Sequence, residues 1–329
     1  MKKQNILITG GFGLLGKPLI LKLINLKYNV FILEKKKNSK RLVFLPKKPK
    51  KIIQGDFTNK ELVGKIIKKN KIDVIFHLGA ITQVLDSLKK PYETHSVNVM
   101  GTINFLENIR LINKKIIFIY SSSDKAYGEL KKRKEYKESD TLDGVYPYDV
   151  SKSSSDLICQ SYSKTYKMKV GIIRCGNIYG PGDLNLGRLI PEVILSTIAK
   201  KKFIIRSNGK ARRDYVFVED VADAYLKLFK KIKFSKDHLK IYNVSSKFNY
   251  SVLQVVNMIL KKMNSVKLKS IVLNNSKQEL NFQRLNYSKI KRDLRWKPKT
   301  DIQLGLEKTI AWYIKFYKFL KNNKRQQLK

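Results

Sequence analysis

Short apolar runs alternate with longer amphipathic segments through the first half of the chain. The apolar runs are continuous, as in parallel strands that helices cover on both faces. They predict strands at Asn5–Thr9, Asn29–Leu33, Lys51–Gln54, Asp73–Leu78, Lys115–Tyr120 and Lys169–Arg174. Segments of helical period predict helices at Leu14–Leu26, Lys60–Lys69, Tyr92–Ile112 and Pro147–Tyr166. This alternation predicts an α/β fold built on a doubly wound parallel sheet.

The pattern changes after Gly176, where loops rich in Gly, Pro, Asn and Arg become frequent. Short strands are predicted at Phe203–Ile205, Asp214–Val218 and Lys240–Val244, and helices at Glu219–Phe229, Ser251–Met263 and Gln303–Phe319. We therefore predict a first domain over residues 1–175, to which residues 214–245 return. Residues 176–329 mainly form a smaller, interleaved α/β lobe that binds the substrate.

A glycine-rich turn follows the first predicted strand and opens the first helix. Gly10, Gly13 and Gly16 have the spacing at which a chain turns sharply, admits a pyrophosphate to its backbone and offers it a helix N-terminus. The turn predicts that the first domain is a Rossmann domain that binds a dinucleotide. Glu34, at the end of the next strand, would accept the ribose hydroxyls and favours NAD, whereas Lys35–Lys37 would suit the 2′-phosphate of NADP.

Composition changes this picture little. The formal net charge is +43, but the lysines are dispersed and no nucleic-acid-binding motif is present, so we expect an anionic substrate and no specific nucleic acid. The two cysteines, Cys159 and Cys175, have no metal-ligand spacing, and no apolar stretch approaches the ~20 residues of a membrane span. We expect a cytoplasmic protein without a bound metal.

Six motifs in order resemble those of the extended short-chain dehydrogenase/reductase family, the NAD-dependent epimerases and dehydratases. They begin at Gly10, Gly55, His77, Asn98, Arg174 and Arg213, so the resemblance covers nearly the whole chain. Gly79 departs from it, since alanine is commoner there. The resemblance implies that cofactor contacts come from Gly10, Phe12, Gly13, Leu14, Leu15, Gly16, Glu34, Asp56, Phe57, Leu78, Gly79, Ala80, Tyr148 and Lys152. It implies substrate contacts from Thr82, Asn177, Arg188 and Arg213.

Two clusters carry the predicted chemistry. Tyr148 and Lys152 form a YxxxK motif, whose spacing puts both side chains on one helical face. The lysine cation is expected to lower the pKa of the tyrosine, so that the phenolate takes a hydroxyl proton while hydride leaves for the nicotinamide. Ser123 lies where the family binds the reacting C4 oxygen. Asp124 and Lys125 resemble the acid–base pair of the CDP-glucose 4,6-dehydratases, whereas the dTDP-glucose enzymes have Asp-Glu.

These motifs predict a nucleotide-sugar 4,6-dehydratase with a CDP-glucose-like substrate, in the biosynthesis of deoxysugars for a surface polysaccharide. Lys125 would remove the C5 proton and Asp124 would protonate the departing C6 hydroxyl. Asn286 departs from the CDP-glucose pattern, where aspartate is usual. The family resemblance also implies a homodimer formed by the helices Tyr92–Ile112 and Pro147–Tyr166.

Three alternatives remain open. Among the dehydratases, the substrate could be GDP-mannose or an unusual nucleotide hexose. A nucleotide-sugar 4-epimerase would need Ser123 and Tyr148 but no acid–base pair. A non-catalytic regulator that binds NAD or nucleic acid could share the scaffold, although the intact Ser123, Tyr148 and Lys152 argue against it.

Overall fold

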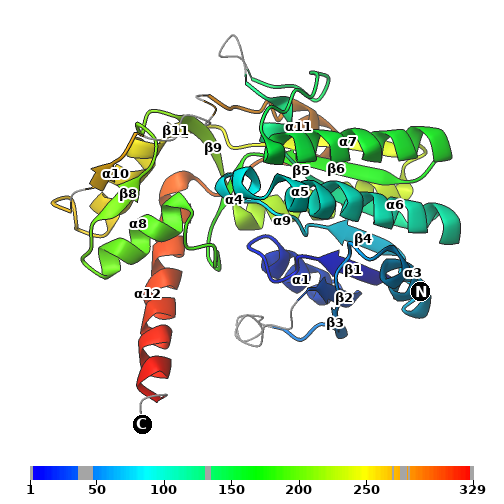
Figure 1. The fold of residues 1–329 in the computed structure, drawn as a ribbon, viewed down its shortest axis with the longest axis horizontal. Coiled ribbons are helices and arrows are strands. Elements are labelled where there is room, and N and C mark those ends of the chain that lie inside the picture. The colour runs from blue at the N-terminus through cyan, green and yellow to red at the C-terminus, as the bar shows by residue number, and fades with distance from the viewer. Residues whose placement is uncertain are drawn as a thin grey trace.

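The computed structural model describes residues 3–35, 47–129, 135–268, 270–274, 280 and 282–326. Its centre is a seven-stranded sheet in the order β3-β2-β1-β4-β5-β6-β10, in which every neighbouring pair is parallel (Figure 1). The strands are β1 (Asn5–Thr9), β2 (Asn29–Glu34), β3 (Lys51–Gln54), β4 (Val74–His77), β5 (Ile117–Ser123), β6 (Val170–Cys175) and β10 (Leu239–Val244). The predicted doubly wound parallel sheet is confirmed.

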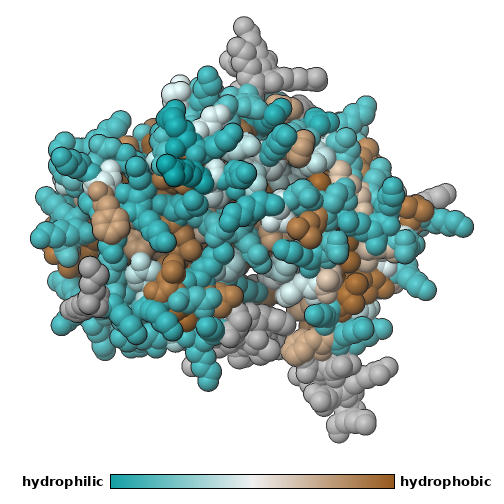
Figure 2. All heavy atoms as spheres, turned by 180° about the vertical axis from the view of Figure 1, so that it is seen from behind, coloured by the Kyte–Doolittle hydropathy of each residue, from teal (hydrophilic) through white to brown (hydrophobic). Residues whose placement is uncertain are grey.

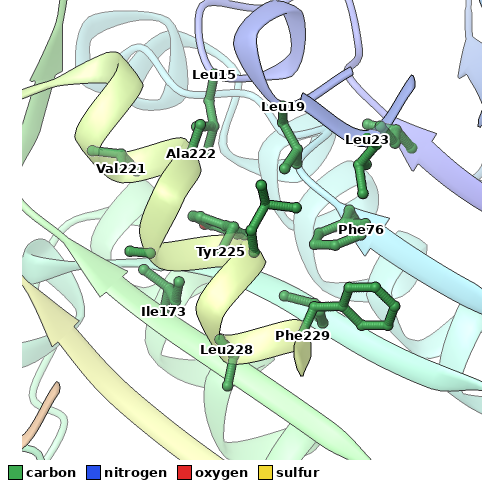
Figure 3. Close-up of a cluster of buried hydrophobic side chains, with 14 of the residues drawn as sticks. Leu15, Leu19, Leu23, Phe76, Ile173, Val221, Ala222, Tyr225, Leu228 and Phe229 are labelled. Atoms are coloured by element: carbon green, nitrogen blue, oxygen red, sulfur yellow. The ribbon is translucent and has the colours of Figure 1, made fainter. Parts of the chain in front are cut away.

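Helices cover both faces of this sheet. One face packs on α3 (Lys60–Lys69), α6 (Gly101–Ile112) and α7 (Pro147–Tyr166), and the other packs on α1 (Gly16–Asn25), α9 (Val218–Phe234) and α11 (Ser288–Leu294). Successive residues of β1 point to opposite faces, so Ile6 and Ile8 join one core and Leu7 the other. Figure 3 shows the first of these cores, where Tyr225 and Phe229 of α9 face Leu19 of α1 and Phe76 of β4.

The second lobe surrounds its own apolar core. A three-stranded sheet has the order β11-β9-β7, and β12 pairs with β8 in parallel. The elements are β7 (Asn177–Tyr179), α8 (Leu189–Ile198), β8 (Phe203–Ile205), β9 (Arg212–Phe217), β11 (Asn249–Ser251), α10 (Val252–Lys262), β12 (Ser270–Val272) and α12 (Ile302–Gln326). A capping box between Ser251 and Gln254 fixes the start of α10. In Figure 1, α12 extends well beyond the lobe on which its first turns pack.

Two elements differ from the predicted ones for local reasons. The helix expected at Tyr92–Ile112 is divided into α5 (Pro91–His95), a π-helical turn η1 (Ser96–Met100) and α6. The strand expected to end at Tyr120 continues as β5 to Ser123, and a 3-10 turn η2 (Asp124–Tyr127) follows it. Both differences lie beside the predicted site. π-helical turns such as η1 are common at functional sites.

Several short elements were not predicted, among them α4 (Val84–Lys89) and α8. Pro191 lies in the first turn of α8, where proline is tolerated, and interrupts the helical signal in the sequence. No helix within the described residues is long and apolar enough to cross a membrane.

Candidate active site

A cleft of about 1390 Å³ opens where the carboxyl ends of the main strands meet the second lobe. The structure brings every predicted catalytic and substrate-contacting residue to this cleft, together with all predicted cofactor contacts except Asp56. In open α/β sheets, ligands bind at this edge, so the location agrees with the predicted chemistry.

The glycine turn forms one wall of the cleft. Gly10 has a φ of +65°, and a Cβ there would lie 2.9 Å from the backbone of Gly79. A Cβ on Gly16 would lie 2.3 Å from the carbonyl oxygen of Gly11. The Gly13 N–H donates to the Gly10 carbonyl at 3.0 Å, which closes the turn. The absent side chains leave a backbone cradle at the start of α1 that fits the pyrophosphate of a dinucleotide.

Glu34 ends β2 at the edge of this cradle. Its Oε1 accepts the backbone N–H of Phe12 at 2.8 Å, which holds the carboxylate against the turn. Lys35 forms an ion pair with Asp56 at 2.8 Å. Asp56 also accepts the backbone N–H and hydroxyl of Thr58, so this carboxylate braces its own loop and does not line the cleft. Lys36 and Lys37, which would suit a 2′-phosphate, lie outside the described residues.

A chain of polar contacts holds the neighbouring wall of the cleft, which the segment after β4 forms beside the glycine turn. The backbone N–H of Gly79 donates to Thr9 Oγ1, which lies 2.9 Å from His77 Nδ1. Burial and the charge of Lys152 lower the pKa of His77 to about 3, so the imidazole is neutral at physiological pH. Asn98, in the π-turn η1, bonds both backbone groups of Ile81, and its Nδ2 also donates to Ser151 Oγ at 2.9 Å. The π-turn therefore links this wall to α7.

Tyr148 and Lys152 lie in the first turns of α7, and both are buried. The Lys152 Nζ donates to the Ser121 carbonyl at 2.8 Å and lies 6.0 Å from the Tyr148 ring centroid. Burial lowers the pKa of Lys152 to about 8. The expected lowering of the Tyr148 pKa by Lys152 is not found, because burial raises this pKa to about 12 and outweighs the opposing hydrogen bond with Ser123.

The strand extension of β5 places Ser123 and the following turn at the cleft. Ser123 Oγ caps η2 by accepting the Lys125 backbone N–H at 3.2 Å and donates to Asp124 Oδ1 at 3.0 Å. Asp124 is buried, and burial raises its pKa against the opposing charge of Lys125. A raised pKa favours the protonated carboxyl that a general acid requires. Lys125 is partly buried and lines the same cleft.

A buried polar network anchors the far end of η2. Arg174 makes two hydrogen bonds of 2.9 Å to the carboxylate of Asp156 on α7. Its Nη1 donates to Tyr127 Oη at 2.8 Å, and Tyr127 Oη donates to Asn243 Oδ1 at 2.8 Å. The Tyr127 ring stacks on Tyr136 with centroids 4.6 Å apart. These contacts fix the acid–base turn to β6, α7 and β10.

Two arginines bring positive charge to the second-lobe side of the cleft. Arg188 Nη2 donates to Thr82 Oγ1 at 3.1 Å, and Arg188 Nη1 lies 3.2 Å from Asp183 Oδ2. Arg213 on β9 is buried, and its Nη1 donates to the Arg212 carbonyl at 2.9 Å. Asn177 begins β7 on the same side. Guanidinium groups from two elements suit a bound diphosphate.

The sequence motifs did not reveal two buried carboxyl groups near the site. Burial raises the pKa of Asp149 to about 6 and that of Asp214 to about 7, and Asp124 contributes to both shifts. Asp149 directly follows Tyr148, and the charge of Lys125 opposes the rise in its pKa. The available sequence signals were an aspartate inside the YxxxK motif and another directly after Arg213.

The fold, the glycine turn and the Ser-Tyr-Lys constellation define an enzyme of the extended short-chain dehydrogenase/reductase type. The nucleotide-sugar epimerases and dehydratases are of this type. The sequence model of the GDP-mannose 4,6 dehydratase family matches residues 7–309, and the chain belongs to this family.

Curated relatives and solved structures agree with this class. The human dTDP-D-glucose 4,6-dehydratase is 30% identical, with 94% of this chain and 90% of the human protein covered. The mouse dTDP-D-glucose 4,6-dehydratase is 31% identical, with 97% and 91% covered. The dTDP-glucose 4,6-dehydratase of Bacillus anthracis in complex with NAD has a TM-score of 0.83 at 26% identity, over 95% and 97% of the chains. The UDP-glucose 4-epimerase of Thermotoga maritima with UDP-glucose has a TM-score of 0.87 at 25% identity, over 95% and 100%.

Proposed function

We propose that this protein is an NAD-dependent nucleotide-sugar 4,6-dehydratase that converts an NDP-hexose to an NDP-4-keto-6-deoxyhexose. The observation that carries the proposal is the Ser123-Asp124-Lys125 turn, which presents a buried acid and a lysine to the cleft beside Tyr148. A CDP-glucose-like substrate is favoured by the Asp-Lys pair. The named dehydratase relatives support the reaction and act on dTDP-glucose, so the base preference rests on the pair alone.

The cofactor assignment rests on the cradle and on Glu34. A bound NAD would supply reversible hydride transfer, for oxidation at C4 of the sugar and later reduction at C6. Gly10 to Gly16 would hold its pyrophosphate, and Glu34 would accept the adenosine ribose hydroxyls. Since Lys35 is paired with Asp56, this cation is engaged away from a 2′-phosphate. The solved dehydratase from Bacillus anthracis holds NAD, which supports the same choice here.

The side chains then have separate tasks. Ser123 orients the C4 oxygen, and Tyr148 as phenolate takes the C4 hydroxyl proton. Once C4 is a ketone, the C5 proton is acidic, and Lys125 removes it in the deprotonated form that a general base requires. Asp124 gives a proton to the C6 oxygen, which leaves as water. Lys125 then returns its proton to C5 when the hydride adds to C6. Arg188 and Arg213 would hold the diphosphate so that the hexose reaches this turn.

Replacement of Lys125 by alanine tests the proposal. Loss of the base is expected to lower formation of the 4-keto-6-deoxy product by about 10²–10⁴-fold, because general bases contribute rate factors of this size. Oxidation at C4 should persist, so reduced nicotinamide should accumulate on the variant. The measurement is product mass and nicotinamide absorbance with a panel of CDP-, dTDP-, UDP- and GDP-hexoses. Lys164→Ala, an exposed change on α7, is the control. Wild-type product formation by Lys125→Ala would refute the assignment.

Epimerisation at C4 is a second candidate reaction, because the structure also resembles a UDP-glucose 4-epimerase. An epimerase returns the hydride to C4 and releases no water. A product of unchanged mass but altered C4 configuration, formed equally by wild type and Lys125→Ala, would therefore favour the epimerase.

We also infer a homodimer through α5, η1 and α7. Large apolar side chains are exposed along these elements, with Tyr92 exposed by 88%, Leu157 by 52% and Met100 by 51%. Such a surface is typical of a protein interface. In analytical ultracentrifugation, the wild type should have twice the monomer mass, and the double variant Met100→Asp/Leu157→Asp should have the monomer mass. Leu26→Asp changes a similarly exposed leucine elsewhere and should leave the mass unchanged. A monomeric wild type contradicts the inference.

A further inference from the structure

The helix α12 continues beyond the body that it stabilises. Its first turns place Leu306, Ile310, Tyr313 and Phe316 on one side, spaced three or four residues apart, and these side chains are buried in the core of the second lobe. After Phe316, no described side chain of α12 is buried. Figure 1 shows this last part of the helix projecting from the lobe.

The apolar stripe nevertheless continues along the projecting part. Phe319 and Leu320 follow Phe316 by three and four residues, so they lie on the same side of the helix. Each is 40% exposed, as is Ile314 one turn earlier. Figure 2 shows that much of the molecular surface is hydrophilic and that hydrophobic residues form small groups on it. Exposed phenylalanine and leucine side chains at the end of a projecting helix therefore indicate a surface that binds a membrane or another protein.

The same segment is strongly basic. Residues 317–329 contain five lysines and arginines and no aspartate or glutamate. Lys315, Lys318 and Lys321 are exposed on the described part of the helix, and Lys321 Nζ lies 5.3 Å from the Tyr317 ring centroid. Two aromatic residues, Tyr317 and Phe319, lie in the projecting part. Lysines beside an apolar stripe are typical of a helix that lies in a membrane interface.

We propose that the projecting end of α12 binds the surface of an anionic phospholipid membrane. Phe319 and Leu320 would enter the boundary between headgroups and acyl chains, and Lys315, Lys318 and Lys321 on the other sides of the helix would attract the anionic surface. The end of the helix would dip into the membrane interface and not cross the bilayer, because no described helix can span one. Nucleic acid would match the charge but would leave the apolar stripe uncovered. A second copy would bring the same basic helix, and like charges would repel.

Membrane binding at α12 is independent of the proposed catalysis. No described side chain of α12 lines the cleft, so the enzyme would work while attached. Changes at the end of the helix should therefore leave turnover of a soluble nucleotide sugar unchanged.

Co-flotation with lipid vesicles tests the proposal on the full-length protein. Wild type should float with vesicles of phosphatidylcholine mixed with phosphatidylglycerol, and not with phosphatidylcholine alone. Phe319→Ser/Leu320→Ser should lose flotation. Lys318→Gln/Lys321→Gln should weaken binding by about 30-fold, since each lysine near an anionic surface contributes roughly fivefold. Added salt should weaken binding further.

Phe234→Ser is the matched control. Phe234 ends α9, is 80% exposed and lies beside Lys233, whose Nζ is 5.2 Å from its ring centroid. This variant should float like the wild type. Circular dichroism should show that every variant is folded. Equal flotation of wild type and Phe319→Ser/Leu320→Ser, or no flotation of the wild type with anionic vesicles, would overturn the proposal. A change of oligomeric mass in the α12 variants would instead assign the stripe to a second copy.

Discussion

Replacing Tyr148 by phenylalanine is expected to lower turnover by about 10²–10⁴-fold, the range that a general acid–base group contributes. The phenol is buried in the cleft beside Ser123, and phenylalanine keeps the ring while it removes the oxygen that takes the C4 hydroxyl proton. Unlike Lys125→Ala, this variant should accumulate no reduced nicotinamide, because the first oxidation fails. Single-turnover absorbance with bound nucleotide sugar measures this difference. Tyr166→Phe, at the opposite end of α7, should retain wild-type turnover.

The pH dependence gives a second readout of the same residue. Burial places the pKa of Tyr148 at about 12, so the phenolate fraction rises as pH increases through the neutral range. The rate of C4 oxidation by wild type should therefore increase with pH. A Tyr148→Phe enzyme that keeps both the rate and this slope would contradict the assigned role.

Replacing Arg174 by methionine is expected to destabilise the protein by about 3–5 kcal/mol, because the change leaves a buried carboxylate without its partner. Arg174 and Asp156 are almost fully buried, and their two 2.9 Å hydrogen bonds hold α7 to β6. Urea denaturation measures the free energy of unfolding. Arg292→Met breaks an exposed ion pair with Asp293 and should cost less than about 1 kcal/mol. The double variant Arg174→Met/Asp156→Leu should recover part of the loss. Equal effects of Arg174→Met and Arg292→Met would refute this account.

Much of the main sheet could be predicted because its signals are local. Apolar runs such as Asn5–Thr9 are short, and the glycine turn at Gly10 follows directly. The π-turn at Ser96–Met100 could not be predicted, since it depends on Asn98 bonding the distant Ile81 and Ser151. The sequence periodicity across this region is that of one continuous helix.

Sequence motifs predicted the residues that meet at the site. They did not predict the properties of these residues that depend on tertiary packing. Ser123, Tyr148 and Lys152 meet as predicted at one cleft. The sign of the Tyr148 pKa shift depends on burial, which no spacing reports. The raised pKa of Asp149 also depends on burial where η2 packs on the start of α7, and there Ser153 Oγ contacts the carbonyls of both Ala126 and Asp149.

The return of α9 to the main sheet has a consequence for biosynthesis. Its Tyr225 and Phe229 cover Phe76, yet about 140 residues of chain separate β4 from this helix. A nascent chain that has delivered the first six strands therefore exposes the part of one apolar sheet face that α1 does not cover, until α9 leaves the ribosome. Late, long-range closure slows folding and exposes intermediates to aggregation. The enzyme should thus depend on chaperones during translation, most of all while the segment between Cys175 and Val218 is being synthesised.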